Sequence, residues 1–155
     1  EGQQTYFLSL LAKTCGKGGQ VEEGLTQLAK AFDLIETSGA HAFEAELYRL
    51  KGWLTLQRFQ VSSSKFQVPP NPQPLTFSPH AEAEACFQKA LEIAQKQQAK
   101  SLELRAATSL ARLWQLQGKQ KDAHQMLAEI YGWFTEGFDT KDLQEAKALL
   151  ESLTE

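Results

Sequence analysis

The sequence predicts an all-α fold of three antiparallel helical hairpins and a final helix, because one helical pattern recurs three times. In each copy a small residue comes four positions before a large apolar residue, and in the first two copies another small residue follows: Gly19, Gly24, Leu28 and Ala31; Ala83, Phe87 and Ala90; Gly118, Ala123 and Leu127. An apolar motif of a leading helix comes before each copy: Leu8-x-x-Leu11-Ala12, Leu47-x-x-Leu50 and Ala107-x-x-Leu110-Ala111. Small residues at such positions let two helices cross closely. Stacked hairpins present a surface for binding and usually carry no chemistry of their own.

The first hairpin is expected over about 4–37, from helices that cover about 4–17 and 20–37. The glycine-rich stretch 16–19 separates them, and glycine tolerates the left-handed conformation that closes a helix. The second of these helices carries its apolar residues along one stripe, which is typical of a helix that packs on one side. Gly39 then ends this helix.

A proline-rich insertion of about 20 residues is predicted inside the second hairpin. Corresponding positions are 39 residues apart between the first two hairpins (Leu8 and Leu47) but 60 apart between the second and third (Leu47 and Ala107). The extra residues fall at 60–78, where four prolines within six residues forbid a helix. Loops of this length are usually functional or disordered, so the insertion is either a dispensable mobile segment or a docking segment.

The helices of the second hairpin lie on either side of this insertion, and the hairpin spans about 41–98. The first of them is expected over about 41–59. The second runs to about residue 98, with Ser78 as its N-cap and Pro79 at its first helical position.

The third hairpin is expected over about 101–134, with Ser101 as its N-cap. A final helix over about 140–153, with Asp139 as its N-cap, follows and has one polar face. Such a helix is a usual end for a stack of repeats, so we expect the whole chain, 1–155, to form one domain.

The composition excludes several classes of protein. With a net charge of −3, the chain lacks the surplus of Lys and Arg of a general nucleic-acid or anionic-membrane binder. No apolar run approaches the roughly 20 residues that span a bilayer, and the polar start gives no signal peptide. The chain begins without Met, which favours a fragment of a larger protein. Cys15 and Cys86 fall on apolar faces, so free core cysteines and a reducing, cytoplasmic setting are expected, with a disulfide as the alternative.

No set of residues predicts catalysis, a cofactor or a metal. The stretch 15–20 lacks the spacing and the hydroxyl residue of a phosphate-binding loop, and it follows a helix. None of the histidines, His41, His80 and His124, has a second His or Cys three or four residues away, the spacing that places two metal ligands on one face. An aromatic cluster within 131–138 is interpreted as a structural cap, with a ligand platform as the alternative.

Helical hairpins with small residues at their crossings resemble tetratricopeptide repeats, although a repeat of about 40 residues exceeds the usual 34. The longer helices are similar to the variety found in bacterial signalling ATPases, including transcriptional activators of the maltose-regulator type. Segments 83–94, 101–114 and 131–140 look like the carboxy-terminal end of predicted bacterial ATPases, and the close match covers about 80–152. In those proteins a nucleotide-binding module precedes the repeats, often with an adenylate-cyclase-like or DNA-binding domain in front. The resemblance therefore implies a right-handed superhelix that serves as a sensor or scaffold region.

The resemblance also implies a binding groove, because the first helix of each hairpin lines the concave surface in this family. Mapping the inward positions onto this chain gives Tyr6, Ser9 and Lys13; Tyr48, Gly52 and Thr55; and Arg105, Thr108, Arg112 and Gln115. Cations and tyrosines on one face of a net acidic protein favour an acidic peptide or a carboxylate, which Arg binds bidentately. Ordinary solvated charges are the competing interpretation.

We therefore expect a non-catalytic interaction or regulatory module of a larger cytoplasmic bacterial signalling ATPase. Its partner would be a protein, a peptide with an acidic segment or another domain of the parent chain, and homo-oligomers stay open. The alternative is a small-molecule sensor of the same kind of protein. A peptide binder should show a shallow charged groove, whereas a sensor needs a closed pocket of several hundred cubic ångströms.

Overall fold

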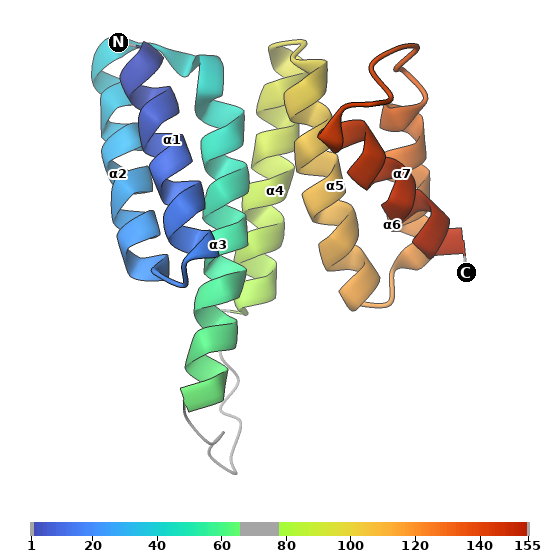
Figure 1. Ribbon diagram of the computed structural model, residues 1–155, viewed down its shortest axis with the longest axis horizontal. Helices are drawn as coiled ribbons and strands as arrows, with labels where there is room; N and C mark the ends of the chain where they lie inside the picture. Colours follow the sequence, from blue (N-terminus) through green and yellow to red (C-terminus); the bar gives the residue numbers. More distant parts are fainter. Residues whose placement is uncertain (1, 66–77, 155) are drawn as a thin grey trace.

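The computed structural model describes residues 2–65 and 78–154, and every regular element in these ranges is helical. The all-α fold class is therefore confirmed for the described part of the chain (Figure 1). In these ranges there are seven α-helices and one 3₁₀ turn: α1 (Gly2–Lys17), α2 (Val21–Ser38), the 3₁₀ turn (His41–Phe43), α3 (Glu44–Lys65), α4 (Pro79–Lys96), α5 (Lys100–Leu116), α6 (Gln120–Tyr131) and α7 (Lys141–Thr154). Among the helices described, none combines the length and the apolar character needed to cross a membrane.

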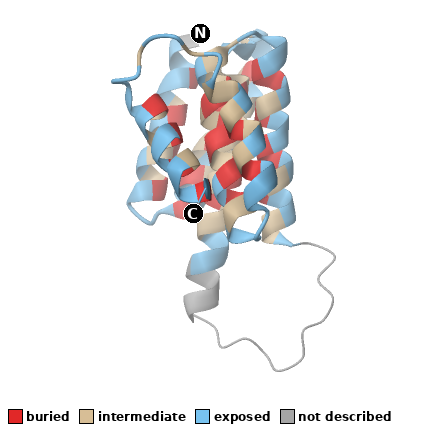
Figure 2. Cartoon of the chain, turned by 90° about the vertical axis from the view of Figure 1, so that its right-hand side faces the viewer, coloured by how far each residue is buried: buried red, intermediate tan, exposed pale blue. Residues whose placement is uncertain are grey.

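Helices that follow one another in the sequence lie side by side in a row (Figure 1). Helix α3 also contacts α1 and α5, and α7 packs against both α5 and α6. Buried residues lie on the faces between helices, and exposed residues cover the outside (Figure 2). As a result, side chains from α1, α3, α5 and α7 can meet on one side of the molecule.

The buried residues follow the predicted alternation of small and large side chains. In α2, α4 and α6 the buried positions include Gly24, Leu28 and Ala31; Ala83, Phe87 and Ala90; and Ala123 and Leu127. Gly19 and Gly118 have a different role, since both are exposed and adopt positive φ angles of 77° and 79° in the turns between helices. They are turn glycines and lie outside the helix crossings.

A close helix crossing joins α3 to α4 at Gly52. A Cβ atom at this position would lie 2.7 Å from Cε1 of Phe87 and 3.1 Å from the carbonyl oxygen of Ala83. The Phe87 side chain is only 2% exposed, so its ring has little room to move away. Gly52 therefore allows the two helices to approach closely at this point.

The bounds of the second hairpin differ from the prediction. The 3₁₀ turn precedes α3, and α3 continues to Lys65, beyond the end predicted near residue 59. The reason is that 60–65 contains no proline, so nothing interrupts the hydrogen bonds of a helix that has already formed. The rest of the predicted insertion, 66–77, lies outside the described residues.

The predicted N-caps are also corrected. Ser78 stands at the N-cap of α4 with Pro79 in the first turn, as expected, but the Ser78 side chain makes no capping hydrogen bond. Ser101 lies inside α5, whose N-cap is Ala99, and Asp139 lies in the turn ahead of α7. Tertiary packing supplies most of the stability of a protein helix, so these helices form without the expected caps.

Cys15 and Cys86 are both free thiols, and Cys86 is buried in α4. Burial raises the pKa of the Cys86 thiol above its ordinary value, against the opposing charge of Lys51. A thiol that stays protonated is a poor nucleophile, so Cys86 serves as a small core residue.

Gly52→Ala is expected to lower the free energy of unfolding by about 1 kcal/mol, measured by urea denaturation. Overpacking costs about 1–3 kcal/mol, which outweighs the gain of about 1 kcal/mol from replacing Gly by Ala inside a helix. Gly18→Ala is the matched control, because no atom lies within 3.4 Å of its Cβ position, and its change should stay below about 0.5 kcal/mol. Equal stability of the two variants would contradict the role given to Gly52.

Candidate functional site

A pocket of about 330 Å³ opens where α1, α3, α5 and α7 come together. We call it the central pocket, lined among others by Lys13, Lys17, Arg49, Trp53, Leu56, Arg105, Arg112, Leu116, Lys141, Asp142 and Glu145. Each helix contributes residues three or four positions apart, which fall on one helix face. The pocket is therefore built by the same packing that brings the odd-numbered helices together.

Positive charge dominates the central pocket, although the protein as a whole has a net charge of −3. Two of the lining side chains are carboxylates, Asp142 and Glu145. Six are cationic: Lys13, Lys17, Arg49, Arg105, Arg112 and Lys141. Such a concentration of like charge around a hollow attracts anions and repels cations.

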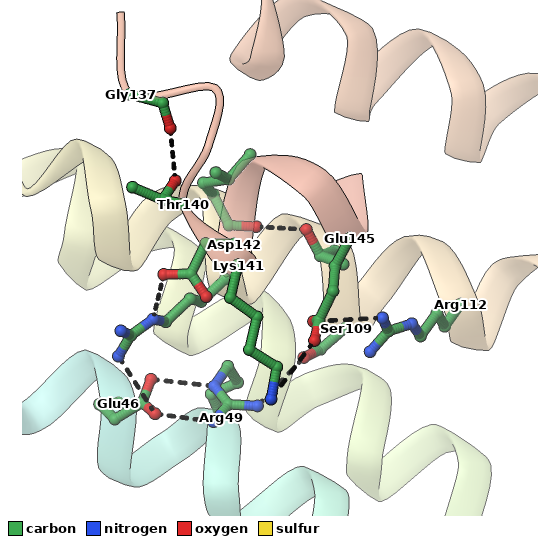
Figure 3. A network of polar contacts seen from close by, with 12 residues as sticks. Glu46, Arg49, Ser109, Arg112, Gly137, Thr140, Lys141, Asp142 and Glu145 are labelled. Atoms are coloured by element: carbon green, nitrogen blue, oxygen red, sulfur yellow. Dashed lines mark hydrogen bonds and ion pairs between the residues drawn. The ribbon is translucent and has the colours of Figure 1, made fainter. Parts of the chain in front are cut away.

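A buried carboxylate orders two of the arginines. Glu46 is 8% exposed, and its two oxygens accept hydrogen bonds from Nη2 and Nε of Arg49 at 2.7 Å and 2.9 Å. Nη1 of Arg105 lies 3.7 Å from the same carboxylate, which links α3 to α5. Nη1 of Arg49 also donates to Oγ of Ser109 at 3.5 Å (Figure 3). Glu46 thus holds Arg49 and Arg105 in place.

Helix α7 supplies carboxylates to the arginines of α5. Nε of Arg105 donates to Oδ2 of Asp142 at 2.7 Å, and Nη2 of Arg112 lies 3.4 Å from Oε2 of Glu145. Glu145 is also 3.7 Å from Nζ of Lys141 (Figure 3). Burial alone lowers the pKa of Arg105, but the hydrogen bond to Asp142 and the charges of Glu46 and Asp142 outweigh it and raise that pKa. Arg105 is therefore a permanent, paired cation.

Lys13 differs from these arginines. It is half-buried in α1, and within the described residues its ammonium group has no hydrogen bond or ion pair. Burial and the charge of Arg49 lower the pKa of Lys13, with smaller contributions from Lys17 and Arg105 and an opposing one from Glu46. The ammonium of Lys13 is thus near the charge of Glu46 but is not paired with it in an ion pair.

The structure brings Lys13, Arg105, Thr108 and Arg112 of the predicted groove residues together at the central pocket. Of these, Thr108 is buried and its hydroxyl donates to the carbonyl oxygen of Leu104 at 2.8 Å. That hydroxyl is already satisfied by its own helix, so the accessible polar groups are the three cations.

Three other predicted residues are held by partners within the protein. The ring of Tyr6 lies 5.4 Å from that of Phe43, and the buried hydroxyl of Ser9 donates to the carbonyl oxygen of Tyr6 at 2.6 Å. Nε2 of Gln115 donates to Oγ of Ser152 at 3.2 Å. None of the three is among the lining residues of the central pocket.

Tyr48 and Thr55 line a different pocket, of about 740 Å³, between α2, α3 and α4. Residues one position further along α3, at 49, 53 and 56, face the central pocket instead. One residue corresponds to a rotation of about 100° around a helix, so the two sets of α3 residues lie on adjoining faces of that helix. Gly52 lies between these faces and packs against α4.

Sequence reasoning missed seven polar or aromatic residues of the central pocket: Lys17, Arg49, Trp53, Ser109, Lys141, Asp142 and Glu145. Lys17 lies four residues after Lys13 and therefore on the same helix face, a signal that was present in the sequence. The contribution of α7 depends on tertiary packing, which no local pattern indicates.

The aromatic cluster lies at the turn between α6 and α7, apart from the central pocket. Tyr131 and Phe138 have ring centroids 5.9 Å apart, and those of Trp133 and Phe134 are 5.2 Å apart. Trp133 is 58% exposed and Nζ of Lys100 lies 5.3 Å from its ring. Among the described residues, no group of His, Cys, Asp and Glu side chains is arranged to hold a metal ion.

Comparisons with models of protein families, with curated proteins and with solved structures find no match to this chain. The function proposed below therefore rests on the geometry and charge of the central pocket.

Lys13→Met is expected to raise the free energy of unfolding slightly at pH 7. The folded state lowers the pKa of Lys13, so it binds this proton less tightly than the unfolded state does, and the protonated form carries a cost. That cost disappears as the pH rises through the folded pKa toward the ordinary lysine value of about 10.4, so the gain should shrink in this alkaline range. Thermal unfolding between pH 7 and alkaline pH measures both effects.

Lys17→Met is the matched control, because Lys17 is exposed in the last turn of the same helix. A cation is favourable at a helix C-terminus, so this variant should be neutral or slightly less stable. A Lys13→Met protein no more stable than the wild type at pH 7 would show that Lys13 carries no such cost.

Proposed function

We propose that this chain is a non-catalytic binding module whose central pocket receives an acidic segment of a partner protein or of another domain in its parent chain. The observation that carries this proposal is the ring of six cationic side chains around one pocket in a protein of net charge −3. The carboxylates Glu46, Asp142 and Glu145 compensate part of this positive charge, and an acidic ligand would compensate the rest. The proposal includes the finer fold assignment, a right-handed superhelix of tetratricopeptide type with α1, α3 and α5 on its concave side.

The chemistry of the pocket suits carboxylates. The guanidinium group of Arg carries a rigid set of donors that matches a carboxylate, and the ammonium of Lys acts as a compact charge. Apolar side chains such as Trp53 and Leu116 lie beside these cations. Electrostatic attraction of this kind steers a charged partner and increases its rate of association.

The cellular setting follows from the resemblance described above. In a cytoplasmic bacterial signalling ATPase, a module of this kind would bind the acidic segment in one state of the protein more tightly than in another. The difference in affinity would shift the population of states of the attached ATPase.

A small-molecule effector is the second candidate, and the volume of the central pocket supports it. About 330 Å³ lies at the lower end of the range for ligand pockets, roughly 300–1,000 Å³. A small polycarboxylate would use the same cations as an acidic peptide.

The variant Lys17→Gln/Arg112→Gln/Lys141→Gln is expected to bind a Glu-rich peptide about tenfold more weakly than the wild type at low salt. All three residues are exposed at the central pocket, so the fold should be unaffected. Fluorescence anisotropy of the labelled peptide measures the affinity, and the binding should weaken as salt is added. A replacement of Arg105 is less suitable, because its loss would leave Glu46 and Asp142 without their partner.

The matched control is Lys89→Gln/Lys121→Gln/Lys147→Gln, which removes the same charge from exposed positions outside the pocket. Equal loss of affinity in the two triple variants would show that the net charge of the protein, and not the central pocket, determines binding of the peptide. No binding of the Glu-rich peptide to the wild type, together with tight binding of a small polycarboxylate such as citrate, would favour the effector function.

A further inference from the structure

The two walls of the central pocket carry different charges. The wall formed by α1 contributes Lys13 and Lys17 and no carboxylate. The wall formed by α7 contributes Lys141 together with Asp142 and Glu145. An acidic ligand is therefore attracted to the α1 wall and repelled by the carboxylates of α7.

The carboxylates of α7 also occupy the arginines of α5. Asp142 pairs with Arg105 at 2.7 Å and Glu145 pairs with Arg112 at 3.4 Å. These two carboxylates of α7 thus make the ion pairs that an acidic ligand would otherwise make. Helix α7 is firmly held, because its apolar stripe is buried against α5 and α6: Leu143, Ala146, Leu149 and Leu153. The arginines are thus already neutralised by the protein itself.

Apolar surface lies next to the α1 wall. A Cβ atom added at Gly16 of α1 would lie 2.5 Å from Cζ3 of Trp53, so this indole ring covers the helix between Lys13 and Lys17. Leu116, at the end of α5, is 76% exposed and lines the same pocket as Trp53 and Leu56. A large apolar side chain of a ligand would find contacts here within reach of the two lysines.

We propose that the partner segment combines an acidic residue with a neighbouring large apolar residue, and that Lys13 and Lys17 bind the acid while Trp53, Leu56 and Leu116 bind the apolar side chain. This inference rests on the proposed function and specifies its partner. It assigns the anchoring role to the lysines of α1, in place of Arg105 and Arg112, which the sequence had suggested.

The test is a double-mutant cycle with a short labelled peptide that alternates Glu and Leu in a Ser/Gly background. The matched peptides carry Gln in place of Glu, or Ala in place of Leu. With C-terminally amidated peptides, Lys13→Met should weaken binding of the Glu–Leu peptide about tenfold and leave binding of the Gln–Leu peptide nearly unchanged, since only the first presents a carboxylate to the ammonium. The loss of affinity for the Glu–Leu peptide should be at least about threefold smaller for Arg112→Gln than for Lys13→Met, because Arg112 is paired with Glu145.

A second cycle tests the apolar half of the inference. Leu116→Ala should weaken binding of the Glu–Leu peptide about threefold and have little effect on the Glu–Ala peptide. Leu116 is largely exposed, so its replacement should leave the fold intact. Circular dichroism of each variant verifies that helicity is unchanged.

The outcomes separate this inference from the proposed function. If the wild type binds the Glu–Leu peptide but Arg112→Gln loses as much affinity as Lys13→Met, the arginines are the anchors and the inference fails alone. Equal binding of the Glu–Leu and Glu–Ala peptides would contradict the proposed binding of a large apolar side chain by Trp53, Leu56 and Leu116. If the wild type binds none of the acidic peptides, the proposed function fails and the inference falls with it.

Discussion

The contact between Gly52 and Phe87 is the constraint on which the pocket depends. Gly52 has no side chain, so α4 can approach α3 until the Phe87 ring fills the space where a Cβ would be. This contact places the Gly52 face of α3 against α4, and the residues that reach the central pocket lie on the adjoining part of the helix surface. Arg49, Trp53 and Leu56 are the residues that reach the central pocket. Packing in the core thus selects the chemistry of the surface.

Glu46 extends this constraint from packing to charge. A buried carboxylate is costly unless cations and hydrogen bonds compensate it, and Arg49 and Arg105 do so from α3 and α5. Arg105 then reaches Asp142, which ties α7 to the same network. Four groups on three helices therefore fix one another, and the guanidinium groups gain defined positions at the pocket. The charge that this network leaves uncompensated lies on α1.

The sequence predicts the fold class well and the site in part, and both results have physical causes. Helical periodicity and glycine turns are local properties, so the sequence predicts the helices, although the predicted ends differ from the observed ends by a few residues. The face that α3 presents to the central pocket depends on contacts between residues far apart in the sequence, such as Gly52 and Phe87, which are 35 positions apart. The local pattern therefore does not indicate that Tyr48 and Thr55 line a different pocket. Lys13, Arg105 and Arg112 were found because α1 and α5 do present the faces that the mapping gave them.

The proposed binding of an acidic ligand rests on the balance of positive and negative charge in the central pocket. The pocket has six cationic side chains and, with the buried Glu46, three carboxylates. These carboxylates form ion pairs with the arginines and Lys141. Lys13 is half-buried, and burial together with the charge of Arg49 lowers its pKa. A ligand that brings a carboxylate to Lys13 removes the repulsion and gains the attraction at once. The proposed acidic ligand would therefore remove a repulsion at Lys13 that a neutral ligand would leave in place.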